Sequence, residues 1–174
     1  MILRKWEDLP SEMQIPEVRK YYDVLKKKKF SLFLKRLFDV TVSFILLVLS
    51  SPVFLILAIA IKLDSKGPVF YRQTRVTQYG KEFRIFKFRS MVTDADKGSL
   101  LTVGGDSRIT KTGRFIRKYK LEEFSQLIDV LRGTMTFVGT RPEVPKYVEK
   151  YTDEMIIETE VGKGTTIKLK VFVK

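Results

Sequence analysis

The longest apolar run of the chain extends from residue 40 to residue 61 and carries no charged side chain. Roughly 20 apolar residues, at about 1.5 Å per residue, are enough to cross a bilayer, so this run has the length of a membrane helix. Ser51 and Pro52 interrupt it near its middle. Because proline removes a backbone donor and clashes with the preceding turn, we predict that the helix breaks there.

Basic residues stand on both sides of this apolar run. They are Lys26, Lys27, Lys28, Lys29, Lys35 and Arg36 before it, and Lys62, Lys66, Arg72 and Arg75 after it. A spanning helix has basic residues mainly on its cytoplasmic flank. A helix that enters the membrane, breaks at Ser51-Pro52 and returns to the same face explains both flanks, since each half is too short to cross alone. A kinked spanning helix and a buried core helix of a soluble protein are the alternatives.

Residues on either side of the apolar run predict further elements. Apolar residues at helical spacing within 17–35 predict a basic helix that lies on the membrane surface. Residues 69–71 and 81–89 have the composition of short strands, and the residues 78–80 between them are typical of a turn.

Helical patterns return in the second half of the chain. A helical region is predicted over 112–118, and the apolar positions from 121 to 131 predict an amphipathic helix that ends at Gly133. A short helix is expected over 146–155. The sequence thus predicts an α+β protein, with a re-entrant membrane helix-break-helix hairpin and a small domain of amphipathic helices and a short β-hairpin.

The last residues, 158–174, differ from the rest. Gly162-Lys163-Gly164 precedes alternating apolar and basic residues over 167–171, which predicts a hairpin turn and a strand. A phosphate loop needs serine or threonine directly after its lysine, and Gly164 occupies that position. Nucleotide binding by this segment is therefore not expected.

The charge balance points to an anionic partner. The 174 residues carry a formal net charge of +13, with a sequence pI near 9.9. Beside a membrane segment, such basic runs are most simply explained by contacts with anionic lipids, although a purely electrostatic peripheral protein is an alternative. No helix-turn-helix spacing, zinc ligands or RNA-binding aromatic signature occurs, so no nucleic-acid partner is expected. The absence of cysteine and histidine excludes thiolate metal sites and Ser-His-Asp chemistry.

Two adjacent carboxylates, Glu122 and Glu123, open the predicted amphipathic helix. They can simply complement the positive end of the helix dipole. In a functional interpretation, one carboxylate is a nucleophile or base and the other binds Mg²⁺. Adjacent residues of a helix point about 100° apart, so the two side chains can divide these roles.

Basic residues on neighbouring segments form the second candidate constellation. They are Lys87, Arg89, Arg114, Arg117 and Arg141. Each one alone is best explained as a solvated charge, but together they would form a diphosphate site. Carboxylates, Mg²⁺, arginines and a membrane segment together favour phosphoryl transfer onto a lipid phosphate.

Several segments, in this order, match one family. They are Lys35-Arg36-Leu37-Phe38-Asp39 before the Ser51-Pro52 helix, Gly67-Pro68-Val69-Phe70-Tyr71-Arg72-Gln73, Phe86-Lys87-Phe88-Arg89-Ser90-Met91, Asp106-Ser107-Arg108-Ile109-Thr110 and Val138-Gly139-Thr140-Arg141-Pro142. Over roughly residues 1–157 the chain resembles the bacterial sugar transferases, the monotopic phosphoglycosyl transferases. This resemblance implies transfer of a phospho-sugar from a UDP-sugar to undecaprenyl phosphate through a covalent acyl-phosphate, with Mg²⁺ as cofactor and release of UMP.

The resemblance also implies a place and a role in the cell. It suggests initiation of exopolysaccharide, capsule or other surface glycan synthesis at the bacterial cytoplasmic membrane. It implies four regions, namely a basic interfacial region at 1–36, the re-entrant hairpin at 37–63, a cytoplasmic catalytic domain at 64–157 and an atypical tail at 158–174. This tail is more similar to the closing hairpin of histidine-kinase-type ATPase domains.

The family pattern assigns roles by position. Glu122 is the nucleophile, Glu123 the metal ligand, Lys87, Arg89, Arg117 and Arg141 bind the phosphates, and Ser51-Pro52 is the helix break. Glu122 stands where the family has aspartate, and its extra methylene moves the attacking oxygen by roughly 1 Å, which can cost on the order of 10²-fold in rate. The alternative function is therefore an inactive or regulatory membrane-bound relative that binds UDP-sugar without turnover.

Overall fold

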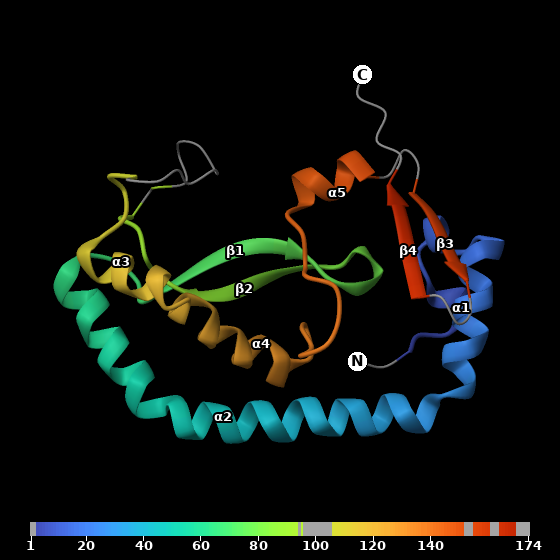
Figure 1. Ribbon diagram of the computed structural model, residues 1–174, viewed down its shortest axis with the longest axis horizontal. Helices are drawn as coiled ribbons and strands as arrows, with labels where there is room; N and C mark the ends of the chain where they lie inside the picture. Colours follow the sequence, from blue (N-terminus) through green and yellow to red (C-terminus); the bar gives the residue numbers. More distant parts are fainter. Residues whose placement is uncertain (1–2, 94, 96–105, 152–154, 161–163, 170–174) are drawn as a thin grey trace. The chain divides into compact units, whose positions relative to one another are not determined.

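The computed structural model describes residues 3–93, 95, 106–151, 155–160 and 164–169 (Figure 1). The chain divides into two compact units, each built from separate stretches of sequence. The terminal unit comprises Met1–Arg36, Thr74–Phe83 and Val138–Lys174, and the central unit comprises Leu37–Gln73 and Arg84–Phe137.

The chain begins with two short 3₁₀ helices, η1 (Trp6–Asp8) and η2 (Ser11–Met13), followed by helix α1 (Pro16–Lys27). Proline at the first position of α1 costs no hydrogen bond, because that N–H has no helical acceptor. The helix predicted over 17–35 is instead divided. The N–H of Lys28 donates to the carbonyl of Leu25 in a tight final turn, and the next helix begins at Lys29.

Helix α2 (Lys29–Asp64) contains the whole apolar run and continues through Pro52, so Ser51-Pro52 does not end the helix, and the re-entrant hairpin stays a prediction. Pro52 has no N–H to donate to the carbonyl of Val48, four residues earlier. The hydroxyl of Ser51 donates to that same carbonyl over 2.8 Å, which supplies the missing hydrogen bond. The helix therefore stays continuous but changes direction in its second half (Figure 1).

The exposure of α2 argues against the core of a soluble protein. Only 11% of its most apolar 18-residue window is buried. Its 36 residues correspond to roughly 54 Å, well beyond the hydrocarbon thickness of a bilayer. By length and composition, α2 is able to cross a membrane.

Strands β1 (Phe70–Val76) and β2 (Glu82–Phe88) form a two-stranded sheet, joined through the 3₁₀ turn η3 (Gln78–Gly80). Tyr79 and Gly80 have φ of 65° and 67°, a left-handed conformation that lets the chain reverse. The predicted strands and turn are confirmed, although the first strand extends to Val76 rather than to Tyr71.

Helix α3 (Lys111–Lys118) confirms the predicted helical region and has two caps at its beginning. The side chain of Thr110 accepts from the N–H of Gly113 over 2.9 Å. The carboxylate of Asp64, at the end of α2, accepts from the N–H of Thr112 over 2.7 Å. The end of α2 is thus joined to the beginning of α3.

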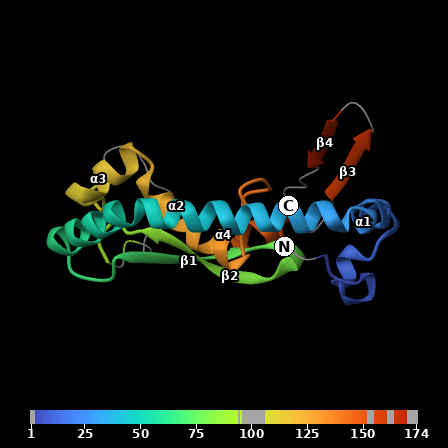
Figure 2. The same ribbon diagram turned by 90° about the horizontal axis from the view of Figure 1, so that it is seen from below.

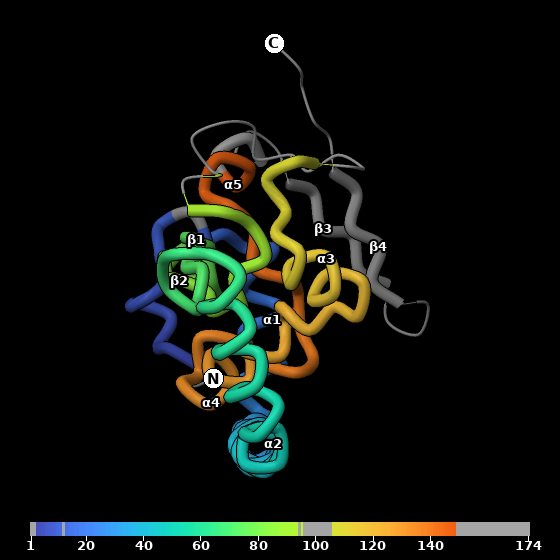
Figure 3. Tube along the Cα trace, turned by 90° about the vertical axis from the view of Figure 1, so that its left-hand side faces the viewer, coloured from blue at the N-terminus to red at the C-terminus, as the bar shows by residue number. Residues whose placement is uncertain are grey.

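The amphipathic helix predicted over 121–131 is two elements, the 3₁₀ helix η5 (Leu121–Gln126) and helix α4 (Leu127–Arg132). Gly133 ends α4 with a φ of 87°, as predicted. In Figures 1 and 3, α4 lies between α2 and the strands β1 and β2.

The chain continues with helix α5 (Pro145–Tyr151) and ends with the antiparallel strands β3 (Met155–Glu160) and β4 (Gly164–Leu169). The predicted C-terminal hairpin is confirmed by the pairing of these strands. Because β3 begins at Met155, the predicted tail boundary at 158 falls inside a strand. The turn residues 161–163 lie outside the described residues.

The core of the central unit joins the second half of α2 to β2 and α3. Leu57, Ile61, Phe88 and Ile116 are buried together, and the rings of Phe54 and Phe88 meet edge to face at 5.0 Å. Strands β1 and β2 run alongside this half of α2 (Figure 2). Burial of these side chains therefore fixes the membrane helix against the sheet.

Replacement of Gly113 by alanine is expected to destabilise the protein. A Cβ atom at this position would lie only 1.9 Å from the carbonyl oxygen of Ser90, a backbone atom that cannot rotate away. Overpacking of this kind costs about 1–3 kcal/mol. Thermal unfolding of the detergent-solubilised protein would show a lowered Tm, whereas Lys111→Ala on the same helix serves as the exposed control. Equal Tm values for the two variants would contradict the predicted clash.

Candidate active site

The two predicted catalytic carboxylates lie in η5, directly after α3. Lys120, with a φ of 54°, forms the left-handed turn that separates the two elements. Glu122 and Glu123 are therefore in a 3₁₀ helix, where successive side chains point about 120° apart rather than 100°. The hydroxyl of Ser125 is fully buried and donates to the carbonyl of Glu122 over 3.2 Å, which holds the backbone of this turn.

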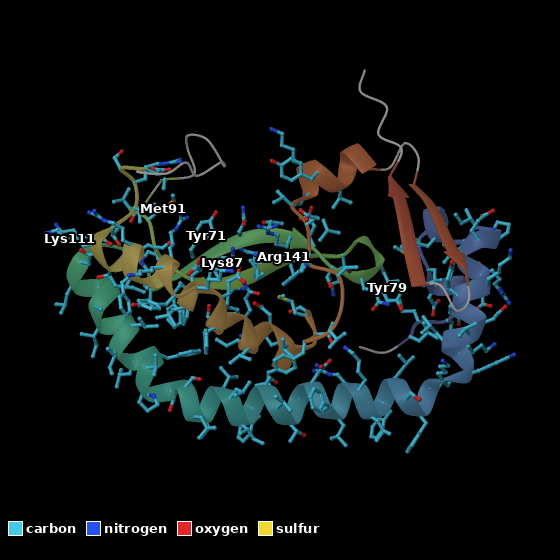
Figure 4. All side chains as sticks on the ribbon, viewed as in Figure 1. Tyr71, Tyr79, Lys87, Met91, Lys111 and Arg141 are labelled. Atoms are coloured by element: carbon cyan, nitrogen blue, oxygen red, sulfur yellow. The ribbon has the colours of Figure 1, made fainter. Side chains whose placement is uncertain are left out.

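Lys87 and Glu123 are brought together from different elements. Lys87 lies on β2 (Figure 4), and its Nζ is 4.0 Å from Oε1 of Glu123. Both side chains are partly exposed, at 20% and 39%, so the pair is accessible to a ligand and screened by water. The sequence prediction that Lys87 converges on the carboxylate pair is thus supported by geometry.

Glu122 has a different environment from its neighbour. Its Oε2 is buried and has no hydrogen-bond partner, and the same is true of Nε2 of Gln126, four residues later. An unsatisfied buried carboxylate oxygen is costly, so its retention suits a group that reacts or binds. Gln126 was not among the residues predicted from sequence, because its pattern position is equally typical of a polar helix residue.

Arg117 is held on α3 beside the strand that carries Lys87. Its Nε donates to the hydroxyl of Ser90 over 3.0 Å. Arg108, in the matching segment before α3, is also held in place, because its Nη2 lies 2.6 Å from Oδ2 of Asp106. Hydrogen bonds from the side chain and backbone of Arg108 lower the pKa of Asp106 to about 2, so this carboxylate is ionised.

Arg89, for which the sequence predicts phosphate binding, is held by groups of the protein itself, and the phosphate-binding role stays a prediction. Its side chain is only 5% exposed, and its guanidinium donates to the carbonyls of Ser65 and Lys66, each over 2.7 Å. Burial lowers its pKa, an effect that the charge of Asp64 partly offsets. Arg89 therefore caps the C-terminal end of α2, where positive charge complements the helix dipole.

Arg141 belongs to the terminal unit, so its part in the site remains a prediction. The segment that carries it is fixed within that unit. Nη1 of Arg75 donates to the carbonyl of Pro142 over 3.2 Å, and the N–H of Val76 donates to the carbonyl of Glu143 over 2.8 Å.

Asp129 is a structural residue that sequence patterns did not identify. It is 2% exposed, and its Oδ2 accepts from the N–H of Phe86 over 2.8 Å, which ties α4 to β2. Burial raises its pKa, against the lowering effects of the Phe86 N–H and the charges of Arg72 and Arg132. The sequence signal that could have identified Asp129 is an acidic residue among the apolar positions of a predicted helix.

The carboxylates of η5 are the candidate ligands for Mg²⁺. Within the described part of the chain, no three histidine, cysteine, aspartate or glutamate side chains gather as a metal site. Mg²⁺ usually takes only one or two carboxylates and completes its shell with phosphate oxygens and water. Glu123 and the unpartnered Oε2 of Glu122 are such carboxylates, so the residues fit a metal held jointly with a diphosphate.

Comparison with known proteins identifies the class. The family model of the bacterial sugar transferases matches residues 30–170, and the chain belongs to this family. The match includes most of the segment 158–174 that we predicted to be atypical.

Three relatives illustrate the similarity. The chain is 40% identical over 136 residues to EpsL of Bacillus subtilis (strain 168), described as an uncharacterized sugar transferase. It is 40% identical over 124 residues to a UDP-N-acetylgalactosamine-undecaprenyl-phosphate N-acetylgalactosaminephosphotransferase of Aeromonas hydrophila. It is 44% identical over 119 residues to a UDP-glucose:undecaprenyl-phosphate glucose-1-phosphate transferase of Escherichia coli (strain K12).

These alignments cover 78%, 71% and 68% of this chain. They span 66%, 29% and 26% of the respective relatives. The similarity is thus to the region that the family model describes, and not to the whole length of the longer proteins.

Proposed function

We propose that this chain transfers a sugar 1-phosphate from a UDP-sugar to undecaprenyl phosphate. The observation that best supports this proposal is the carboxylate pair in η5. In this pair, Glu122 has a buried, unpartnered oxygen, and Glu123 lies near Lys87. Family membership and the names of the two phosphotransferase relatives support the substrate classes.

In the first step, Oε2 of Glu122 attacks the phosphorus that carries the sugar. A new bond forms between the carboxylate oxygen and phosphorus, the bond from phosphorus to the bridging oxygen breaks, and UMP leaves with that oxygen. Lys87 and Arg117 lie on neighbouring elements, and their charges stabilise the negative oxygens of the diphosphate.

In the second step, a phosphate oxygen of undecaprenyl phosphate attacks the same phosphorus. The acyl-phosphate bond breaks, the carboxylate of Glu122 is regenerated, and the product is an undecaprenyl diphosphate-linked sugar. Mg²⁺, when held by Glu123 together with the substrate, would neutralise charge on the diphosphate.

The proposed activity requires a membrane, and we propose that α2 enters and leaves it on the cytoplasmic face. The basic residues on both flanks of α2 and its change of direction support this topology. Accessibility labelling in cells is expected to find tags at both ends of the chain on the cytoplasmic side. Pro52→Leu, which restores a backbone donor, is expected to shift the population toward a spanning helix. Tags on opposite sides of the membrane in the unmodified protein would exclude the re-entrant topology.

The proposed reaction is tested by UMP release from the protein in lipid nanodiscs with Mg²⁺ and undecaprenyl phosphate. UDP-N-acetylgalactosamine and UDP-glucose, the donors named for the relatives, are the first substrates to compare. Release that depends on undecaprenyl phosphate supports a transferase. Binding of UDP-sugar by folded protein without any UMP release would instead support the alternative of a non-catalytic relative, which the glutamate at position 122 favours.

A further inference from the structure

A cavity of about 270 Å³ lies in the terminal unit, between the first residues of the chain, α1 and the beginning of α2. Five cationic side chains and a single carboxylate, that of Glu7, line it. The cations are Arg4, Lys5, Arg19, Lys26 and Lys29. A concave site with this excess of positive charge attracts anions. No part of the reaction proposed above uses it.

The lysines of this cavity are available to a ligand. Lys5, Lys26 and Lys29 are exposed, and they form no ion pair with a carboxylate in the part of the chain that the structure describes. Arg19 is more constrained, because its Nε lies 3.5 Å from Asp23. Binding of an anion would therefore satisfy charges that have no carboxylate partner among the residues that the structure describes.

The aromatic wall of the cavity is already in place. The rings of Trp6 and Tyr22 meet edge to face at 5.2 Å, and the guanidinium of Arg19 lies 4.6 Å from the centre of the Trp6 ring. The hydroxyl of Tyr22 donates to the carbonyl of Arg4 over 3.1 Å, which fixes the N-terminal segment onto α1. Tryptophan and tyrosine are the residues preferred at membrane–water interfaces.

Exposed apolar side chains adjoin the cations. Phe30 and Phe33, directly after Lys29 in α2, are 73% and 62% exposed. This neighbourhood distinguishes a lipid from a soluble anion, because a phospholipid brings acyl chains next to its phosphate.

We propose that this cavity binds the phosphate group of an anionic phospholipid. Lys26 and Lys29 contact the phosphate, while the exposed apolar residues at the beginning of α2 lie against the acyl chains. This site is distinct from the carboxylate pair of η5 and does not depend on catalysis.

Trp6 provides a direct readout, because it is the only tryptophan of the chain and lines the cavity. The full-length protein in a neutral detergent is titrated with short-chain phosphatidylglycerol, short-chain phosphatidylcholine and inorganic phosphate. Phosphatidylglycerol is expected to produce a saturable change in tryptophan fluorescence at lower concentrations than the other two. Saturation by inorganic phosphate at equal or lower concentrations would overturn the lipid assignment, and an equal response to phosphatidylcholine would overturn the requirement for an anionic headgroup.

The double variant Lys26→Gln with Lys29→Gln tests the assigned cations. Its affinity for phosphatidylglycerol is expected to fall roughly 25-fold, from about five-fold for each lysine beside an anionic headgroup. Lys20→Gln with Lys27→Gln removes the same charge from α1 at positions that do not line the cavity, and it should keep the affinity within about two-fold. Equal losses in the two variants would overturn the site and leave only a general attraction between a basic protein and anionic lipid.

Discussion

Glu122→Gln is expected to lower UMP release by on the order of 10³-fold or more, because the amide cannot form the acyl-phosphate. Glutamine has nearly the same size and shape as glutamate, so the fold of η5 is retained. The loss should therefore appear without a lowered Tm. UDP-sugar binding should also persist, because Lys87, Arg117 and Glu123 are unchanged.

Detection of the covalent intermediate in wild-type protein and in the variants tests most directly which carboxylate is the nucleophile. With UDP-sugar and no acceptor, intact-protein mass spectrometry should find a phospho-sugar on wild-type protein, mapped to Glu122, and none on Glu122→Gln. Glu123→Gln should still form the adduct, at a lower rate, because the attacking oxygen remains. If Glu122→Gln released UMP at the wild-type rate, Glu122 would not be the nucleophile.

Glu122→Asp tests how the longer side chain of glutamate affects the rate of UMP release. If both wild type and this variant release UMP, their ratio measures the effect of the extra methylene. Release by the aspartate variant alone would show that the binding residues are intact and that the longer side chain silences the natural protein.

Arg89→Met is expected to have the largest effect on stability. The carbonyl of Ser65 would lose the guanidinium as its donor, that of Lys66 would keep only the hydroxyl of Thr93, and a hydrogen bond to a charged group contributes about 1.5–3 kcal/mol. A total of about 3 kcal/mol corresponds to a Tm lowered by roughly 10 °C for a chain of this size. Thermal unfolding in detergent measures this shift.

Arg114→Met is the matched control for this prediction. It removes the same charge from an exposed position on α3, where substitutions usually change stability by less than about 0.5 kcal/mol. If Arg89→Met kept the wild-type Tm but bound UDP-sugar more weakly, the phosphate-binding role expected from the sequence would be correct after all.

Helix ends and turns that depend on a few neighbouring residues could be predicted from the sequence. Gly133 marked the end of α4, because a C-terminal cap depends on a few adjacent residues. The turn at Tyr79 and Gly80 was predicted for the same reason. The pattern did not show that the residues from Leu121 to Gln126 are 3₁₀, since apolar spacing alone does not distinguish the two helix types over so few residues.

Sequence patterns did not show the features that depend on contacts between distant residues or on a neighbouring side chain. Arg89 matched a family segment, but its contacts with Ser65 and Lys66 place it at the end of α2. Pro52 predicted a break, and the hydroxyl of Ser51 supplies the hydrogen bond that proline removes. The sequence grouped Lys87 with other basic residues as a diphosphate site, but no local pattern showed that its Nζ lies beside Glu123.

The hydrogen bond from the N–H of Thr112 to Asp64 has a mechanical consequence. It couples the end of α2 to the beginning of α3, which is followed along the chain by η5 with Glu122. A bilayer that is thicker or thinner than the apolar length of α2 makes such a helix tilt or shift. If α2 lies in the bilayer as proposed, the carboxylates would move with it, and lipid thickness would set the height of Glu122 above the hydrocarbon.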